Sequence, residues 1–391
     1  PILPGHWRQL KLNAYTMSNG LSQLPPGAVL VQASFSFTNK EQPGDAAPHF
    51  GENSTLAVSQ TSLFYAGRLF GPYAESLFGA TAANVLNKFG VFGQMTFDGV
   101  GRVLSWDNLE LRYADNATIG DHQITYGFFV NNNPGLEDPW NSTPAWGFPF
   151  SSSPLGPTPG AATLIDGGLS QQVAGAGAYV LLSNSVYLEL AGYHTLSVPF
   201  QRAVGVAPEG ETQVSGLAPY WRLAYTKAVG NQSFEIGTFG LAADSHPGRN
   251  QSAGHDSTLD WGLDAQYQVA EGPHDLIATA STIYEHNSWD ASQRLGNTAN
   301  STGNLWTAKV NVDYLYDKTY GAAAGYFFAD GKDDPALYPD NVRGHPLSDG
   351  HVLVADLGFL PGLDRRLASV TDAYIALTVR CADGNRPSAA D

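Results

Sequence analysis

The clearest pattern in the chain is a strict alternation of apolar and polar residues. Between residues 305 and 316, Trp306, Val310 and Tyr314 belong to one set of positions, and Lys309 and Asp313 belong to the other. A β-strand places successive side chains on opposite faces, whereas an amphipathic helix repeats with a period of about 3.6 residues. The segment is therefore predicted to be a strand with one apolar and one polar face.

The same alternation recurs along most of the chain, strongly at 29–37, 259–269 and 276–285. Weaker segments bring the candidate strands to about fifteen; they lie at 57–70, 88–98, 102–114, 122–132, 170–183, 186–197, 217–228, 232–243, 319–328, 351–360 and 369–381. Bacterial single-chain barrels have even strand numbers, so we predict sixteen, the missing one being residues 8–16 or an overlooked segment. No domain boundary interrupts the series. We expect an N-terminal segment at 1–28, one barrel domain at 29–381 and a polar tail at 382–391.

Short and long connections alternate along the chain. Residues 229–232, 271–273 and 317–319 have the composition of tight turns, whereas 133–169 is long and rich in aromatic residues and proline. In a channel, such a long segment can fold inward as a constriction. It can equally form an outside loop that packs on its own aromatic side chains, and the sequence leaves both interpretations open.

The composition indicates where the apolar faces lie. Charged residues make up 14% of the chain, whereas a typical soluble protein has about 25%. The chain has 43 glycines, 18 tyrosines, 19 phenylalanines and 8 tryptophans, and its mean hydropathy is −0.18. No apolar run approaches the roughly 18–20 residues of a membrane-spanning helix. In lipid, a sheet must satisfy every backbone group by closing on itself. The fold class we expect is therefore all-β: a single closed antiparallel transmembrane β-barrel of about 16 strands.

The two strand faces give two sets of candidate residues. Lipid-facing candidates are Trp261, Leu263, Tyr267, Trp306, Val310, Val312 and Tyr314. Lumen-lining candidates are Glu110, Arg112, Glu189, Arg222, Glu235, Asp260, Asp264, Asp275, Glu285, Lys309 and Asp313. Because acids outnumber bases in the second set, a water-filled lumen would favour cations. The alternative is that these groups only solvate a water-facing wall.

Several other classes of function are excluded. The net charge of −16 argues against nucleic acid as a partner. The single cysteine, Cys381, excludes an intrachain disulfide and a cysteine-cluster metal site, and the histidines lack ligand-type partners at metal-site spacing. No hydrolase, zinc-protease or phosphate-loop motif is found. We expect no enzymatic activity, no catalytic residue and no bound metal.

Three stretches resemble one family of outer-membrane proteins. They are PILPGHWRQLKLNAYT at 1–16, LDWGLDAQYQVAEGPHDLIATASTIYEHNSWDAS at 259–292 and KTYGAAAGYFFADG at 318–331. They are similar to segments of porin-like barrels labelled cytochrome c, in which a small monohaem segment is fused to the barrel, as in the porin-cytochromes that oxidise extracellular ferrous iron. The resemblance implies an electron conduit. The chain departs from this family because it lacks Cys-x-x-Cys-His, so haem c would require that motif before Pro1. It also departs at its polar C-terminal tail, because family barrels usually end in an aromatic residue.

Three functions follow in order of preference. The first is an outer-membrane porin-like channel of a Gram-negative bacterium, with an acidic, cation-favouring lumen and small solutes or ions as its partners alongside outer-membrane lipid. The second is the barrel part of a porin-cytochrome electron conduit that exchanges electrons with periplasmic cytochromes. The third is a soluble secreted β-rich binding protein. The sequence leaves open whether the chain forms a homotrimer.

Overall fold

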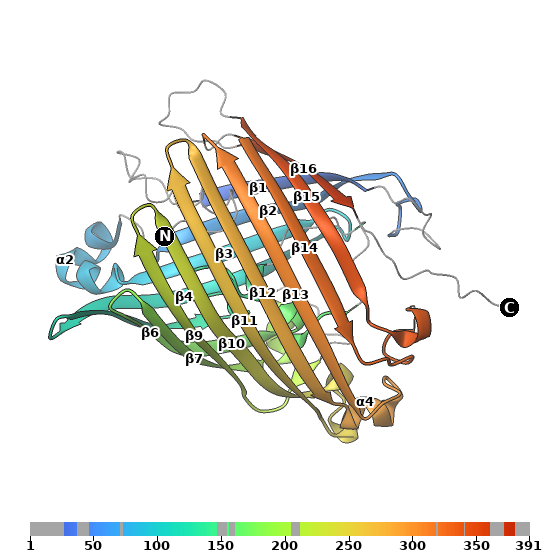
Figure 1. Cartoon of the computed structure of the whole chain (residues 1–391). Helices are drawn as coiled ribbons and strands as arrows, with labels where there is room; N and C mark the ends of the chain where they lie inside the picture. The colour runs from blue at the N-terminus through green and yellow to red at the C-terminus, as the bar shows by residue number, and fades with distance from the viewer. Residues whose placement is uncertain are drawn as a thin grey trace.

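The structure is a computed structural model that describes residues 27–36, 47–70, 73–146, 155, 161–204, 212–317, 320–339, 341–359 and 371–379. Its main feature is one large antiparallel sheet, which is twisted and strongly curved in Figure 1. No helix within the described ranges is long and apolar enough to cross a bilayer.

The sheet is a meander in which each strand pairs with its neighbour along the chain. Its path runs through β1 (Gly27–Ser36), β2 (Thr55–Arg68), β3 (Phe89–Asp98), β4 (Val103–Ile119), β5 (His122–Asn131), β6 (Val173–Leu182), β7 (Val186–Thr195), β9 (Ala218–Val229), β10 (Gln232–His246), β11 (Asp256–Glu271), β12 (His274–Ser288), β13 (Thr302–Tyr316), β14 (Tyr320–Gly331), β15 (Ser348–Phe359) and β16 (Thr371–Val379). Each of the fifteen segments predicted from alternation overlaps one of these strands.

The predicted number of strands and the predicted closure need correction. The sheet counts 16 strands, but one of them, β8 (Gln213–Val214), has two residues and pairs with β10 off the path, which leaves fifteen in the meander. Among the described residues, no pairing joins β1 to β16, so a closed barrel is not shown. The predicted strand at 8–16 and the tail at 382–391 lie outside the described residues, and β1 begins two residues before the predicted boundary at 29.

The two ends of the sheet differ in their connections. Glycines with positive φ, such as Gly230 and Gly272, make tight turns between β9 and β10 and between β11 and β12. We call this end the turn end. The opposite end, the loop end, carries 132–172, 196–217 with α3 (Val198–Ala203), 247–255, 289–301 with α4 (Asp290–Leu295) and 332–347. In Figure 1, α4 lies at the loop end and α2 (Ala74–Leu86), which connects β2 to β3, lies at the turn end.

Two irregularities interrupt the alternation near the start of the sheet. The register of β1 with β2 shifts between Gln32 and Ala33, because Ser59 on β2 is left without an opposite residue. A second shift lies between Gly93 and Met95, where β3 pairs with β4. A bulge of this kind exchanges the faces of the residues that follow it. The alternation in β2 and β4 is therefore weaker in the sequence than in β11 or β13.

Candidate functional site

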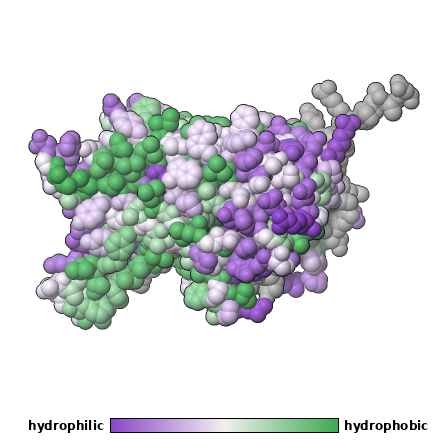
Figure 2. Space-filling model, turned by 90° about the horizontal axis from the view of Figure 1, so that it is seen from below, coloured by the Kyte–Doolittle hydropathy of each residue, from purple (hydrophilic) through white to green (hydrophobic). Residues whose placement is uncertain are grey.

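The two faces of the sheet have the reverse of the burial expected in a soluble protein. On β11, Leu259, Trp261 and Leu263 are 48%, 50% and 44% exposed, whereas Asp260 and Asp264 on the opposite face are 0% and 3% exposed. We call the first the apolar face and the second the polar face. Figure 2 shows hydrophobic residues spread over the surface seen from below, with hydrophilic residues gathered toward one side.

The predicted lipid-facing residues all belong to the apolar face. Six of them are at least 38% exposed: Trp261, Leu263, Trp306, Val310, Val312 and Tyr314. Tyr267 is half-buried because its ring packs against Phe234, with the ring centroids 4.9 Å apart. The face extends beyond these strands to Phe128 on β5 and Val31 on β1, which are 52% and 56% exposed.

The predicted lumen-lining residues all belong to the polar face, but most of them are covered. Four are half-buried: Glu110, Arg112, Lys309 and Asp313. Seven are buried: Glu189, Arg222, Glu235, Asp260, Asp264, Asp275 and Glu285. The sequence predicted the face of these residues, but it did not predict what covers them.

Residues 132–172 connect β5 to β6, and we call them the inner loop; those of them that the structure describes cover much of the polar face. Its described part is 132–146, Leu155 and 161–172. Contacts run from Asn132, whose side chain bonds the backbone of β4, to Asp166, which pairs with Lys309 on β13. The described part of this segment therefore folds inward onto the polar face and does not form an outside loop, whereas the constriction stays a prediction.

Arg222 on β9 is the centre of the contact between the inner loop and the sheet. Its guanidinium donates to Asp264 over 2.8 and 3.0 Å, and it lies 3.1 Å from Asp138 and 3.2 Å from Glu235. The Ser142 hydroxyl lies between Asp138 and Asp264 and hydrogen-bonds both. Arg222 is 1% exposed, so one cation is surrounded by three carboxylates out of contact with water.

The sequence supplies a local reason for the shape of the loop around Asp138. The Asp138 carboxylate accepts backbone N–H groups of Trp140, Ser142 and Thr143, the pattern by which a short acidic side chain closes a turn. The turn places the Trp140 ring 5.5 Å from the Arg222 guanidinium, in a cation–π contact. The same turn directs the Trp140 carbonyl to the Gln266 side chain on β11.

A second set of contacts holds the later half of the inner loop. The backbone N–H of Ile165 donates to Asp260 over 2.7 Å, and that of Leu164 donates to Glu285 over 2.5 Å. Ile165 and Leu169 then pack into an apolar cluster with Tyr220 and Phe239 of the sheet. The buried carboxylates of β11 and β12 are therefore acceptors for the loop backbone.

A third contact involves two acidic residues. The Asn131 side chain donates to Glu137 over 2.5 Å, and Tyr187 donates to Glu189 over 2.5 Å. Burial, followed by repulsion from Glu189, raises the pKa of Glu137 well above its ordinary value. A raised pKa favours the protonated, neutral form of Glu137, so it reduces the charge that this pair brings to the interior.

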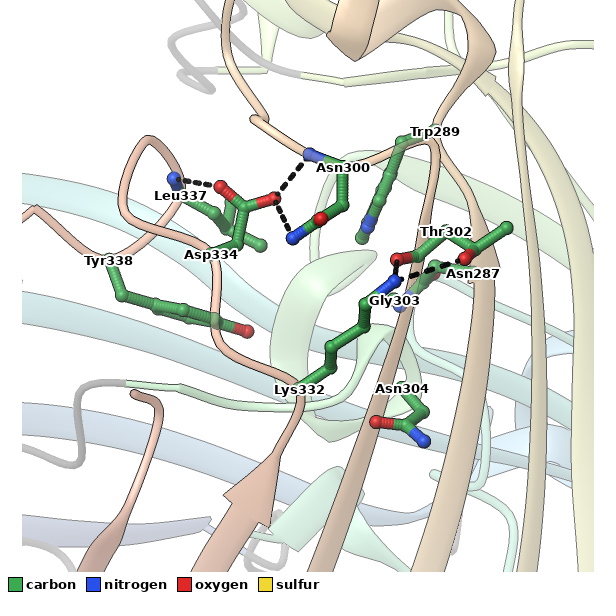
Figure 3. A pocket seen from close by; sticks show the side chains of 10 residues that line it. All are labelled: Asn287, Trp289, Asn300, Thr302, Gly303, Asn304, Lys332, Asp334, Leu337 and Tyr338. Atoms are coloured by element: carbon green, nitrogen blue, oxygen red, sulfur yellow. Dashed lines mark hydrogen bonds between the residues drawn. The ribbon is translucent and has the colours of Figure 1, made fainter. Parts of the chain in front are cut away.

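At the loop end, Asp334 joins two connections of the sheet. Figure 3 shows it beside Asn300, Leu337 and Tyr338, where the side chains line a small pocket with Trp289 and Lys332. Asp334 accepts backbone N–H groups from Ala299 and Asn300 on one connection and from Ala336 and Leu337 on its own. It thereby fixes 289–301 against 332–347.

Sequence reasoning missed the residues of the inner loop itself. Glu137, Asp138 and Ser142 were not predicted as site residues, and the only signal was the adjacent pair of acids after Asn-Pro-Gly at 133–135. It also missed α2, whose Leu77 and Phe78 are 63% and 49% exposed.

A metal ion or a haem would need ligands from the same residues. Within the part of the chain that the structure describes, no group of three or more His, Cys, Asp or Glu side chains could hold a metal ion. Haem c attaches through two cysteines, and the chain has one, Cys381, which lies outside the described residues. The residues present therefore do not fit a covalent haem.

Comparison with known proteins adds little to this geometry. No family model and no curated protein matches the chain. Among solved structures, the chain is similar to OmpTdeltaL8, the loop L8 deletion mutant of OmpT, an outer membrane protein of Vibrio cholerae, with 9% identity. The similarity covers 79% of this chain and 93% of that chain at a TM-score of 0.35.

Proposed function

We propose that the protein is a membrane-spanning β-barrel of the bacterial outer membrane that acts as a porin-like channel, narrowed by the inner loop. One observation carries the proposal: buried charges on one face of the sheet and half-exposed tryptophan, leucine and valine on the other. Exposed apolar surface of this extent is unfavourable in water but favourable in hydrocarbon. A polar interior is what a water-filled passage requires.

The dimensions of the strands support a membrane location. A strand that crosses a bilayer at a tilt of about 45° needs about 9–11 residues. The meander strands have between 9 residues in β16 and 17 residues in β4. Every strand of the path is therefore long enough to cross.

The inner loop supports a restricted passage rather than an open one. It is held to β9, β11, β12 and β13 by Arg222, Asp260, Glu285 and Lys309, so it lies on the polar face along its described length. A segment held at so many points reduces the free cross-section of the interior.

The preference for cations remains part of the proposal. Among the predicted polar-face residues, eight are acids and three are bases, and each acid that stays ionised adds negative potential to the passage. Most of these acids are buried, whereas the side chains of Asp313 and Lys309 are half-buried.

Electrical conductance across a lipid bilayer tests the proposed channel. The protein, purified in detergent and added to a planar lipid bilayer in KCl, is expected to give discrete conductance steps, with heat-denatured protein as the control. Protein that stays monodisperse without detergent and gives no steps would contradict the proposal and would favour the soluble binding protein. The electron conduit depends on a haem attached before Pro1, and no described residue favours it.

A further inference from the structure

An open cavity lies at the loop end, beside the last residues of β6 and β7 to reach that end. Its volume is about 550 Å³, within the range of about 300–1,000 Å³ that is usual for small-molecule sites. It is bounded by the β6–β7 pair, by the residues that lead into α3, by β8 and by the short turn η4 (Pro247–Arg249). The cavity therefore lies apart from the inner-loop contacts around Arg222.

The polar lining of the cavity suits an anion. It holds one permanent cation, Arg249, together with His194, Ser197 and Gln213, and none of the described residues that line it is acidic. The His194 ring donates from Nδ1 to the Gly216 carbonyl oxygen over 2.5 Å, which fixes the ring at the end of β7. Guanidinium, hydroxyl and amide groups can all donate hydrogen bonds to a phosphate oxygen.

Arg249 is held in place by contacts deeper in the fold. Its Nη2 donates to Gln201 Oε1 over 2.8 Å, and Gln201, which is 0% exposed, donates from Nε2 to the Gln172 carbonyl oxygen over 2.8 Å. The Arg249 backbone has a φ of +60°, which is unfavourable for a residue with a Cβ. Strain of this kind persists where the surroundings fix the residue, often at ligand sites. The guanidinium is therefore positioned at the cavity by α3 and the end of the inner loop.

The outward side of the sheet next to the cavity is apolar. The outward residues along β7 are Leu188, Leu190, Gly192 and His194. The two leucines are 42% and 71% exposed, and Leu217, 67% exposed, covers Gly192, where an added Cβ would lie 2.8 Å from the Leu217 side chain. At about 3.3 Å per residue, Leu190 and His194 are about 13 Å apart along the strand. The surface therefore changes from apolar to cationic over that distance.

We propose that the cavity binds the anionic phosphate of a membrane lipid, whose acyl chains lie on Leu188, Leu190 and Leu217. The proposal rests on the membrane location proposed above, which places the loop end of the apolar face at the level of the lipid headgroups. Arg249 and the leucines then follow one another in the same order as the phosphate and the acyl chains of a lipid. A water-soluble anion would use the polar lining alone, whereas a lipid uses both surfaces.

Native mass spectrometry of the full chain in detergent tests the proposal. Phosphatidylglycerol, which is anionic, is titrated in parallel with phosphatidylcholine, which is zwitterionic. The unmodified protein should bind phosphatidylglycerol about tenfold more tightly, the effect of one hydrogen bond to a charged group. Arg249→Gln should abolish this preference. Arg249→Lys keeps the positive charge and should retain most of it, which separates loss of the charge from loss of the fold.

Arg343→Gln is the matched control. Arg343 also lies in a short turn at the loop end, η6 (Val342–Gly344), it has a φ of +58°, and it is exposed. Its substitution should leave the preference for phosphatidylglycerol unchanged. Equal loss in Arg249→Gln and Arg343→Gln would show general attraction of anionic lipid to the loop end and would overturn the proposal. An undiminished preference in Arg249→Gln would overturn it as well.

Water-soluble glycerol phosphate distinguishes a lipid from a free phosphate. It should displace phosphatidylglycerol only at far higher concentration, because it lacks the acyl chains. Displacement at equal concentration would overturn the assignment of a lipid.

Conductance in planar bilayers separates this proposal from the proposed function. Channels formed by a protein that does not prefer phosphatidylglycerol would overturn the lipid site alone. Folded protein that binds phosphatidylglycerol through Arg249 but forms no channels would overturn the proposed channel alone.

Discussion

At the scale of single residues, the fold depends on how buried charges are matched. Arg222 is surrounded by Asp138, Glu235 and Asp264, and its guanidinium lies over the Trp140 ring. Two buried ions lose the favourable interaction with water, and their mutual attraction repays that loss only when the geometry is good. The Arg222 contacts therefore determine where the inner loop lies more than they add to net stability.

Removing the positive charge of Arg222 is predicted to destabilise the protein strongly. Arg222→Met leaves three carboxylates without their shared partner, and breaking a buried ion pair costs about 3–5 kcal/mol. The free energy of unfolding, measured by denaturant titration in detergent micelles, should fall by that amount. Lys88→Met is the control, because the Lys88–Asp115 pair is exposed and should change the unfolding midpoint little. An equal effect of both substitutions would contradict the role assigned to Arg222.

Two glycines of the inner loop provide a matched pair of substitutions. Gly135 and Gly167 have φ values of +81° and +92°, so alanine is strained at both. A Cβ at Gly135 would lie 2.8 Å from Thr143 Oγ1, whereas nothing lies within 4 Å of one at Gly167. Gly135→Ala should destabilise the protein by about 1–3 kcal/mol more than Gly167→Ala, the usual cost of overpacking.

The same denaturant titration measures both glycine variants. Equal stability of the two would mean that the turn around Asp138 is not packed as described. A larger single-channel conductance in Gly135→Ala than in Gly167→Ala would further indicate that the turn restricts the passage.

At the scale of elements, the Asp334 carboxyl group joins two connections at the loop end, and this group can be protonated. Partial burial acts to raise the pKa of Asp334, but hydrogen bonds from the backbone of Ala299, Asn300, Leu337 and Ala336 outweigh it and hold the pKa below its ordinary value. A depressed carboxylate pKa stabilises the contact above the pKa of the unfolded chain, about 3.9. The contribution is lost as the pH falls through the lower folded value.

Hydrogen exchange tests this contact. The protection factors of the Ala299 and Asn300 amides, corrected for intrinsic exchange, should be constant from neutral pH to about pH 5 and fall in more acidic solution, below the ordinary aspartate pKa of about 3.9. In Asp334→Ala, the protection should be low throughout and show no step. A step that persists in the variant would assign the titration to another group.

The elements were predictable to different degrees. β11 and β13 follow from the sequence because their alternation is uninterrupted, whereas the bulge at Ser59 weakens it in β2. α2 was missed because Ala74–Leu86 is rich in alanine and interrupted by Gly79, which is non-helical. The inward fold of 132–172 depends on partners such as Asp264, which is 122 residues from Ser142, and no local pattern contains that information.

At the scale of the whole molecule, the charge of the passage makes a prediction about ions. With KCl at two concentrations across the bilayer, the sign of the reversal potential should show that potassium permeates better than chloride. Asp313→Asn should weaken the preference and Lys309→Gln should strengthen it, because both side chains are half-buried on the polar face. Preference for chloride, or shifts of the same sign in both variants, would contradict the acidic passage.

At the same scale, a membrane location requires hydrocarbon on the apolar face, and site-directed spin labelling of β11 measures this directly. Labels introduced one at a time from residue 258 to 268, in protein reconstituted into phospholipid vesicles, are tested for collision with oxygen and with a water-soluble nickel complex. Oxygen dissolves preferentially in hydrocarbon, so collision with oxygen should be high at 259, 261, 263, 265 and 267 and low between them, the positions that alternate in exposure. Collision with the nickel complex at the odd-numbered positions, or no alternation at all, would contradict a membrane location of this face.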